Sequence, residues 1–316
     1  MKTDSRRADR QVARVEGGRP AGRPYTMQLG QLSIARIVER EEPAFAPARL
    51  LPDATPEGLA PHRHWLEPNA LDPATGLLIL PIQTYVVRTR HHNILIDACL
   101  GEDKTCRWHR PWHKMRGLRF LADLAAQGLQ PADIDFVLCT HLHGDHVGWN
   151  TRRASGRWVP TFPNARYVMA RREVDYWRGY NRDASAEDYE ECIDESVLPV
   201  VEAGRALLID GDHAIDDEAR IEPLAGHTPG HFGVRLRSAG AEGIMIGDLM
   251  HSPVQCAEPD WRAGSDVDPV LARRARRHFL ESHADTDCLV LTAHFPSPSV
   301  GHIRRQGRAF RFDYGD

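Results

Sequence analysis

The run His-Leu-His-Gly-Asp-His at residues 141–146 constrains this chain more than any other part of its sequence. It directly follows residues 136–140, a short apolar run that predicts a buried strand. Imidazole and carboxylate groups are costly to bury unless a partner compensates for their lost hydration. Four such groups at the end of one buried strand therefore predict a metal site.

The spacing inside this run separates its ligand-type side chains into two pairs. His141 and His143 are two residues apart, so in an extended segment they point to the same side and can bind one ion. Asp145 and His146 follow Gly144, where the chain can bend sharply, and they can serve a second ion. The run therefore offers ligands to two neighbouring sites.

The composition is typical of a globular chain that acts on a small molecule. With 316 residues, of which 41% are hydrophobic, the chain can bury a full core as one large domain or two modest ones. We expect one domain over residues 27–316, preceded by a disordered tail at 1–26 that is rich in Arg, Gly and Pro. The net charge of −4 gives no overall attraction to nucleic acid or anionic membranes, so neither is an expected partner.

Cysteine usage and hydropathy favour a cytoplasmic location. The six cysteines are scattered without a C-x-x-C pair, which argues against a disulfide scaffold in a chain of this size. The N-terminal residues lack the apolar stretch of a secretory signal. No window approaches the roughly 20 apolar residues of a membrane-spanning helix. The sequence is compatible with either a monomer or a homodimer.

Strand-like and helix-like segments are mixed along the chain. Strands are expected near residues 29–38, 79–87, 93–96, 134–140, 166–169, 206–209, 220–224, 232–237, 243–246 and 288–292, and helices near 118–128, 171–179 and 268–284. This order predicts a layered α/β architecture with sheets inside and helices outside. The Pro-rich segment 41–76 and the segment 100–117 are expected to be irregular loops that select the substrate.

Further ligand-type residues follow other predicted strands. His227, Asp248 and His294 each stand at or just beyond an apolar run, as His141 does. Imidazole and carboxylate suit zinc and related divalent ions. These residues can complete both sites, and Asp248 can bridge them because a carboxylate has two oxygens to share.

Four motifs in this order resemble the metallo-β-lactamase superfamily. They are His-x-His-x-Asp-His at 141–146, Gly-His-Thr-Pro-Gly-His at 226–231, Gly-Asp at 247–248 and Ala-His at 293–294. The resemblance implies an αββα sandwich, with two mixed sheets flanked by helices and two Zn²⁺ ions at the edge between the sheets; manganese, iron or cobalt suit the same ligand types. The implied ligands are His141, His143 and His227 for the first metal, Asp145, His146 and His294 for the second, and Asp248 as the bridge. His231, in the second motif, is expected to be structural.

Departures within the motifs separate branches of this superfamily. At position 143 the chain has histidine, whereas a glutamate there would resemble the flavodiiron oxidoreductases. At position 248 it has aspartate, whereas the best-known β-lactamase class has cysteine. The stretches 247–255 and 293–303 resemble the group of N-acyl-homoserine lactonases and methyl parathion hydrolase. This likeness implies hydrolysis of a lactone or ester, such as an acyl-homoserine lactone, by a hydroxide that bridges two metals. Asp145 and Asp248 are then the catalytic carboxylates, and Asp145 relays a proton to the leaving alkoxide.

Other functions share these motifs. Thioester hydrolysis of the glyoxalase II type and organophosphate hydrolysis remain alternatives among the hydrolases. Persulfide dioxygenases resemble the chain in the 141–146 run, but they use a single iron bound by two histidines and one aspartate. A non-catalytic module that keeps the fold and binds metal is a third class.

Several residues outside the ligand set are candidates for positioning or for substrate contact. Asp97 follows a predicted strand, and we expect it either to orient a ligand imidazole or to cap the next turn. His251 and His302 are expected to support the ligands or to contact substrate. Residues expected to line an aromatic pocket for an acyl or aryl group are Trp108, Trp149 and Phe295. The alternative for each tryptophan is that it fixes its loop to the body of the domain.

Overall fold

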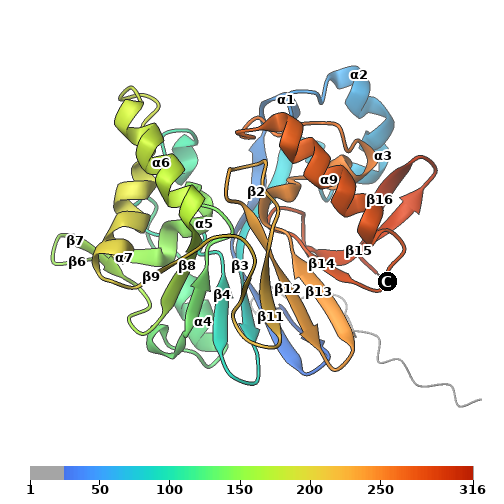
Figure 1. The fold of residues 1–316 in the computed structure, drawn as a ribbon. Coiled ribbons are helices and arrows are strands. Elements are labelled where there is room, and N and C mark those ends of the chain that lie inside the picture. The colour runs from blue at the N-terminus through green and yellow to red at the C-terminus, as the bar shows by residue number, and fades with distance from the viewer. Residues whose placement is uncertain (1–24, 316) are drawn as a thin grey trace, which may run out of the picture.

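Two β-sheets lie face to face with helices outside both of them in the computed structural model, which describes residues 25–315 (Figure 1). The predicted tail at 1–26 falls outside these residues except for Tyr25 and Thr26, which already belong to the first strand. The first sheet therefore begins before the predicted domain boundary at residue 27.

The first sheet has the strand order β1-β2-β3-β4-β5-β8-β9. Its strands are β1 Tyr25–Leu29, β2 Leu32–Phe45, β3 Leu78–Arg88, β4 Asn93–Ile96, β5 Phe136–Leu138, β8 Arg166–Ala170 and β9 Ala206–Ile209. Strands β1 to β4 pair antiparallel, whereas β4, β5, β8 and β9 pair parallel. The carboxyl ends of the parallel strands therefore share one edge of this sheet.

The second sheet has the order β10-β11-β12-β13-β14-β15-β16. Its strands are β10 His213–Ala214, β11 Ala219–Pro223, β12 Phe232–Ser238, β13 Ala241–Met245, β14 Leu289–Leu291, β15 Val300–Gln306 and β16 Ala309–Asp313. Only β13 and β14 pair parallel among these described strands. A separate hairpin joins β6 Thr151–Ala154 to β7 Arg157–Pro160.

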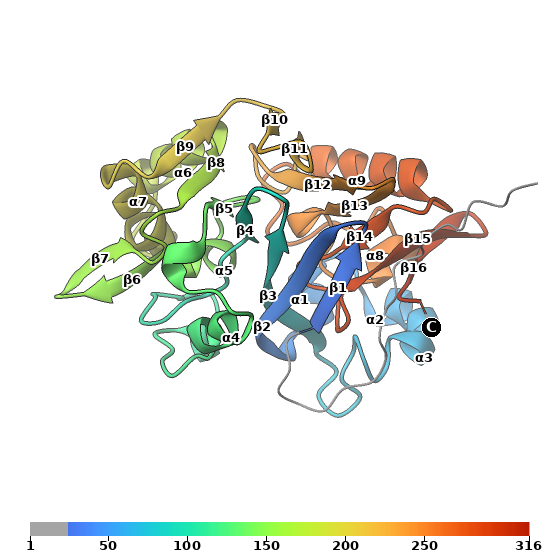
Figure 2. The same ribbon diagram turned by 90° about the horizontal axis from the view of Figure 1, so that it is seen from below.

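Helices cover the outer faces of both sheets. The α-helices are α1 Pro47–Leu50, α2 Pro56–Leu59, α3 Arg63–Leu66, α4 Phe120–Ala126, α5 Gly144–Val147, α6 Arg171–Asp183, α7 Leu198–Glu202, α8 Val254–Ala257 and α9 Pro269–His283, and a π-helix, η5, spans Ile193–Val197. Helices α6 and α7 lie outside the first sheet, and α9 lies against β12 and β13 of the second (Figure 2). Within residues 25–315, no helix combines the length and apolar character needed to cross a bilayer.

The main core lies between the two sheets. In β4, Ile94 and Ile96 belong to the cluster that packs against the second sheet, whereas Leu95 belongs to the cluster under the helices. This alternation follows from the geometry of a strand, whose successive side chains point to opposite faces. Phe279 of α9 packs into a third cluster on the outer face of the second sheet. These layers confirm the predicted αββα sandwich.

The segment 41–76 is more regular than the sequence predicts. Strand β2 continues to Phe45, where it pairs with Leu78 of β3, and register shifts follow Val38 and Pro43. Three short helices then occupy much of the remaining segment. Proline has no backbone N–H and is unfavourable inside a sheet. The register shift after Pro43 lets β2 continue to pair with β3 although this hydrogen-bond donor is missing.

Gly148 marks a close backbone approach just after the histidine-rich run. Its amide donates to the Cys99 carbonyl oxygen at 2.7 Å, and the Trp149 amide donates to Ala98 at 2.7 Å. A Cβ atom on Gly148 would lie 1.9 Å from the carbonyl oxygen of Leu100. Glycine at this position therefore lets the two buried segments join.

We predict that Gly148→Ala lowers the free energy of unfolding by about 2 kcal/mol, because two buried backbone segments must move apart. Gly179→Ala is the matched control, since a Cβ there meets no atom within 4 Å and α6 gains helix propensity. Denaturant unfolding of both variants tests this prediction. Equal midpoints for the two variants would contradict it.

Candidate metal centre

The 141–146 run begins in the short connection after strand β5 and continues into helix α5. Strand β5 ends at Leu138, and α5 begins at Gly144 with His143 at its N-cap. His141 and His143 precede α5, whereas Asp145 and His146 lie within it. This change of backbone conformation sends the two pairs of side chains into different ligand groups.

The remaining candidates come from turns next to strands of the second sheet. His227 lies between β11 and β12, Asp248 lies in a 3-10 turn after β13, and His294 follows β14. All three side chains are buried. The structure brings the seven predicted residues together in two groups: His141, His143, His227 and Asp248 in one, and Asp145, His146 and His294 in the other.

Three imidazole nitrogens converge in the first group. His143 Nδ1 lies 3.0 Å from His141 Nε2 and 3.0 Å from His227 Nε2. Asp248 Oδ2 lies 3.4 Å from His227 Nε2 and 3.7 Å from His141 Nε2. These atoms surround a position that suits a tetrahedral ion with nitrogen and oxygen ligands.

The second group uses the other oxygen of Asp248. His146 Nε2 and His294 Nε2 lie 3.3 Å apart, and Asp145 Oδ2 is 3.6 Å from each of them. Asp248 Oδ1 lies 3.2 Å from His146 Nε2 and 3.1 Å from His294 Nε2. Asp248 therefore presents one oxygen to each group, as its predicted bridging role requires.

The chemistry of these donors fits divalent cations. Asp248 Oδ1 is buried and accepts no hydrogen bond from the described residues, which is costly unless a cation compensates it. Burial lowers the pKa of His141 and of His143 well below the usual value, although Asp248 opposes this shift. Both imidazoles are therefore neutral at pH 7 and offer a lone pair, which metal binding requires.

The ring nitrogens that point away from the two groups have partners of their own. His294 Nδ1 lies 3.0 Å from the carbonyl oxygen of Pro81, and His141 Nδ1 lies 3.1 Å from Thr140 Oγ1. A donor interaction at Nδ1 fixes the tautomer and leaves the Nε2 lone pair free for a metal. The partners thus orient these rings toward the centre.

Asp97 lies where the sequence suggested that it orients a ligand. Its Oδ2 is 2.9 Å from His146 Nδ1, and its Oδ1 accepts from the Thr140 amide at 2.8 Å. Its backbone has a φ of 62°, a conformation that non-glycine residues adopt only when surrounding contacts impose it. The contact with His146 favours the positioning role over a simple turn cap.

Asp266 has the same relation to His227, and the sequence did not reveal it. Asp266 Oδ1 lies 3.0 Å from His227 Nδ1, while its Oδ2 accepts from the Ala263 amide at 2.9 Å and lies 3.7 Å from the buried guanidinium of Arg276. Asp266 stands in a loop without a strand-end pattern. Only its position in space marks it as a positioning residue.

His231 supports Asp248 from behind. Its Nδ1 donates to the Leu224 carbonyl at 2.9 Å, and its Nε2 accepts from the Asp248 amide at 3.0 Å. Burial lowers the pKa of His231 to about 4, so the ring is neutral and can accept this hydrogen bond. His231 belongs to neither ligand group, in keeping with the structural role expected for it.

An open cavity of about 350 Å³ exposes the two groups to solvent. Its wall includes Phe45, Trp108, Trp112 and His251. Trp112 stands edge-on to Phe45, with ring centroids 5.6 Å apart, and edge-on to Trp108 at 5.4 Å. Two predicted substrate-contact residues, Trp108 and His251, therefore reach the cavity.

Three other predicted substrate contacts lie away from this cavity. Trp149 is buried against Phe120, and Phe295 is fully buried against Phe312. His302 lies on β15 and pairs with Asp313 of β16. Core packing occupies Trp149 and Phe295, whereas His302 is half-buried on the second sheet and does not line this cavity.

Comparison with known proteins defines the class. The model of the Metallo-beta-lactamase superfamily matches residues 79–294, more than half of the chain. The matched span contains both ligand groups and the strands that carry them. The chain therefore belongs to the metallo-β-lactamase superfamily, as the motifs predict.

Curated relatives of the chain include N-acyl homoserine lactonases. The chain is 31% identical over 202 residues to the N-acyl homoserine lactonase AttM of Azorhizobium caulinodans, a match that covers 56% of this chain and 64% of that protein. It is 27% identical over 180 residues to an N-acyl homoserine lactonase of a Bacillus species, covering 54% and 64% respectively. The chain thus matches slightly less than two thirds of the length of these relatives.

Solved structures support the same fold. One is AidC, described as a dizinc quorum-quenching lactonase in complex with a product; its TM-score is 0.73 at 21% identity, covering 93% of this chain and 98% of that chain. Another is the hydrolase AbOPH in the beta lactamase superfamily, with a TM-score of 0.75 at 24% identity, covering 94% and 99%. Both likenesses extend over nearly the whole chain.

We predict that Asp266→Asn weakens zinc binding by roughly tenfold or more, because the amide holds His227 less firmly and makes it a weaker ligand. Asp260→Asn is the matched control, since Asp260 is exposed and pairs with Arg277 on the surface. Competition with a chromogenic chelator measures the affinity of each variant. Unchanged zinc affinity in Asp266→Asn would show that its contact with His227 has no positioning role.

Proposed function

We propose that the chain is a metal-dependent hydrolase with a dinuclear centre that cleaves a lactone or ester. The observation that carries this proposal is the geometry of Asp248, which presents one oxygen to each of two groups of imidazole and carboxylate donors. The proposed ligands are His141, His143, His227 and Asp248 for one ion, and Asp145, His146, His294 and Asp248 for the other. We propose Zn²⁺ for both positions; manganese, iron and cobalt suit the same donors.

When bound, two neighbouring divalent cations lower the pKa of water and polarise a carbonyl oxygen, which is the chemistry that hydrolysis of a lactone needs. Asp145 lies on the cavity wall, and its side chain is 13% exposed against 4% for Asp248. Asp145 is thus the carboxylate that can accept a proton and return it to the leaving alkoxide. The Asp248 backbone amide donates to His231 Nε2 at 3.0 Å, and this contact fixes Asp248 between the two ligand groups.

His251 is the proposed contact for the substrate oxygen. It lines the cavity, and its Nε2 lies 3.1 Å from Asp248 Oδ2. Its Nδ1 is buried and has no hydrogen-bond partner among the described residues. Burial lowers the pKa of His251, so its single N–H points from Nε2 to the Asp248 carboxylate. The lone pair on Nδ1 can then accept a hydrogen bond from an O–H group of the substrate.

The relatives favour lactones over the alternative substrates. The curated relatives given above are N-acyl homoserine lactonases, so an acyl-homoserine lactone is the first substrate we propose. Thioesters and organophosphates remain alternatives at the same centre. A persulfide dioxygenase with a single iron is less favoured, because Asp145, His146 and His294 form a second complete group of donors. A cytoplasmic location and a homodimer remain predictions.

We predict that the purified chain binds about two zinc ions and that His143→Ala loses most of the hydrolysis of acyl-homoserine lactones, by a factor of about a thousand or more. His278→Ala, an exposed histidine on α9, is the control that keeps full activity. Metal analysis and turnover of lactones, aryl esters, S-lactoylglutathione and methyl parathion are measured with and without chelator. One iron per chain with oxygen consumption on a persulfide would contradict the proposed hydrolase.

A thermal test of the metal centre does not need a substrate. We predict that added zinc raises the melting temperature of the metal-free wild type, because an ion that binds only the folded state stabilises it. His294→Ala should give a smaller rise than the wild type, and His278→Ala should give the same rise. An identical rise for His294→Ala would remove His294 from the proposed ligands.

A further inference from the structure

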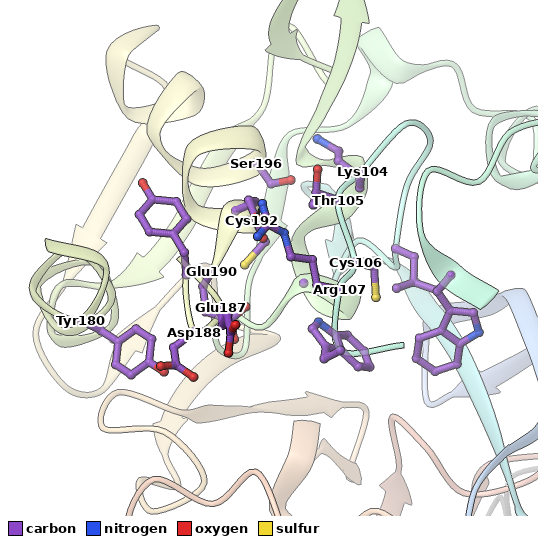
Figure 3. A pocket seen from close by; sticks show the side chains of 16 residues that line it. Lys104, Thr105, Cys106, Arg107, Tyr180, Glu187, Asp188, Glu190, Cys192 and Ser196 are labelled. Carbon is purple, nitrogen blue, oxygen red and sulfur yellow. Dashed lines mark ion pairs between the residues drawn. The ribbon is translucent and has the colours of Figure 1, made fainter. Parts of the chain in front are cut away.

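A second cavity of about 300 Å³ adjoins the metal-site cavity. The two cavities share Trp108, Trp112, Gly144 and Glu190 in their walls. We call the second cavity the side chamber; Figure 3 shows the residues that line it. The side chamber therefore borders the metal-site cavity at these four residues.

The side chamber combines aromatic side chains with a group of carboxylates. Figure 3 shows Glu187, Asp188 and Glu190 grouped on one side of it. The charged residues that line the chamber are Glu187, Asp188, Glu190, Glu191, Lys104 and Arg107. Carboxylates outnumber cations, so an alkyl chain entering here would displace water from charged groups without replacing its hydrogen bonds.

Lys104 is engaged with the protein and does not offset this acidity. Its Nζ lies 2.5 Å from Thr151 Oγ1, 3.0 Å from the Glu195 carbonyl oxygen and 3.6 Å from the ring centre of Trp158. Burial lowers the pKa of Lys104 to about 7. The amine therefore carries only part of a positive charge near pH 7, and its donors are already used.

Arg107 is engaged as well. Its guanidinium forms an ion pair with Glu191 at 2.5 Å and donates to the carbonyl oxygen of Ala186 at 2.9 Å. The charges of Arg107 and Glu191 therefore cancel and add nothing to the net charge of the chamber. The remaining carboxylates still give the chamber a negative potential, which attracts a positively charged ligand.

Glu190 is the carboxylate that faces both cavities. Its backbone is fixed by Asn181, which accepts from the Glu190 amide at 2.9 Å and donates to its carbonyl at 2.9 Å. Among the described residues, its carboxylate has no hydrogen bond or ion pair. Burial raises the pKa of Glu190 to about 7, and the neighbouring carboxylates of Glu191 and Asp145 add to this shift. A cation beside Glu190 would stabilise its ionised form, which burial and the neighbouring carboxylates disfavour.

Ser196 gives a second, independent sign of a polar ligand. It lies in the π-helix η5, is fully buried and lines the side chamber. Its Oγ has no hydrogen-bond partner among the described residues. A buried hydroxyl without a partner is rare in folded proteins, and a polar group of a ligand would satisfy it.

We infer that the side chamber receives the acyl substituent of the substrate and that Glu190 makes the protein prefer substituents that carry an ammonium group over alkyl chains of equal length. The inference rests on the proposed function, because it places the ester or lactone carbonyl at the metal centre. An ammonium group beside Glu190 favours the ionised carboxylate and gains a charge-assisted hydrogen bond with it, whereas an alkyl chain leaves the carboxyl group dehydrated and without a partner.

The test compares two lactones of equal chain length, N-(ω-aminohexanoyl)-homoserine lactone and N-heptanoyl-homoserine lactone. For the zinc-loaded wild type, we expect kcat/KM to be roughly tenfold higher for the amino substrate, mainly through a lower KM, because one charge-assisted hydrogen bond gives about that factor. Glu190→Gln should lose this preference. Glu202→Gln, a matched change on an exposed residue of α7 outside both cavities, should keep it.

Binding of the two hydrolysis products separates this inference from the proposed function. Titration calorimetry should show tighter binding of the aminohexanoyl product than of the heptanoyl product to the wild type, and equal binding to Glu190→Gln. Equal affinities in the wild type, or a preference that survives in Glu190→Gln, would overturn the inference. If the amino product binds more tightly but neither lactone is hydrolysed, the chamber assignment stands and the proposed lactonase activity fails.

Discussion

One buried carboxylate links the two sheets at the edge that carries the candidate metal centre. Asp248 Oδ1 lies 3.1 Å from His294 Nε2, and Asp248 Oδ2 lies 3.4 Å from His227 Nε2. The first sheet contributes the 141–146 run to the same point, so ligand atoms from both sheets surround Asp248. Because an uncompensated buried carboxylate is costly, this arrangement depends on positive charge between the ligand groups.

The surroundings of the centre divide into a rigid part and a variable part. The ligands stand on strand ends and short turns, and Asp97, Asp266 and His231 hold them from behind through hydrogen bonds. The walls of both cavities come largely from loops, including the segments 104–112 and 187–192. Metal chemistry can therefore stay constant while loop residues such as Glu190 determine which substituent is accepted.

Local sequence predicted most of the architecture. The expected helices at 118–128, 171–179 and 268–284 correspond to α4, α6 and α9, although α6 continues past the predicted end to Asp183. The prediction of an irregular loop over 41–76 was wrong in part, since pairing with β3 extends β2 through proline-containing sequence to Phe45. Trp149 and Phe295 were chosen for their proximity in sequence to ligands, yet both are buried in core clusters.

The sequence by itself determined the superfamily and the seven residues that gather at one edge, because short motifs at strand ends carry that information locally. Tertiary structure alone decided which oxygen of Asp248 faces which group, that Asp266 supports His227, and that Glu190 stands between two cavities. These relations join residues from loops far apart in the chain. Packing sets their distances, and no local pattern of side chains encodes them.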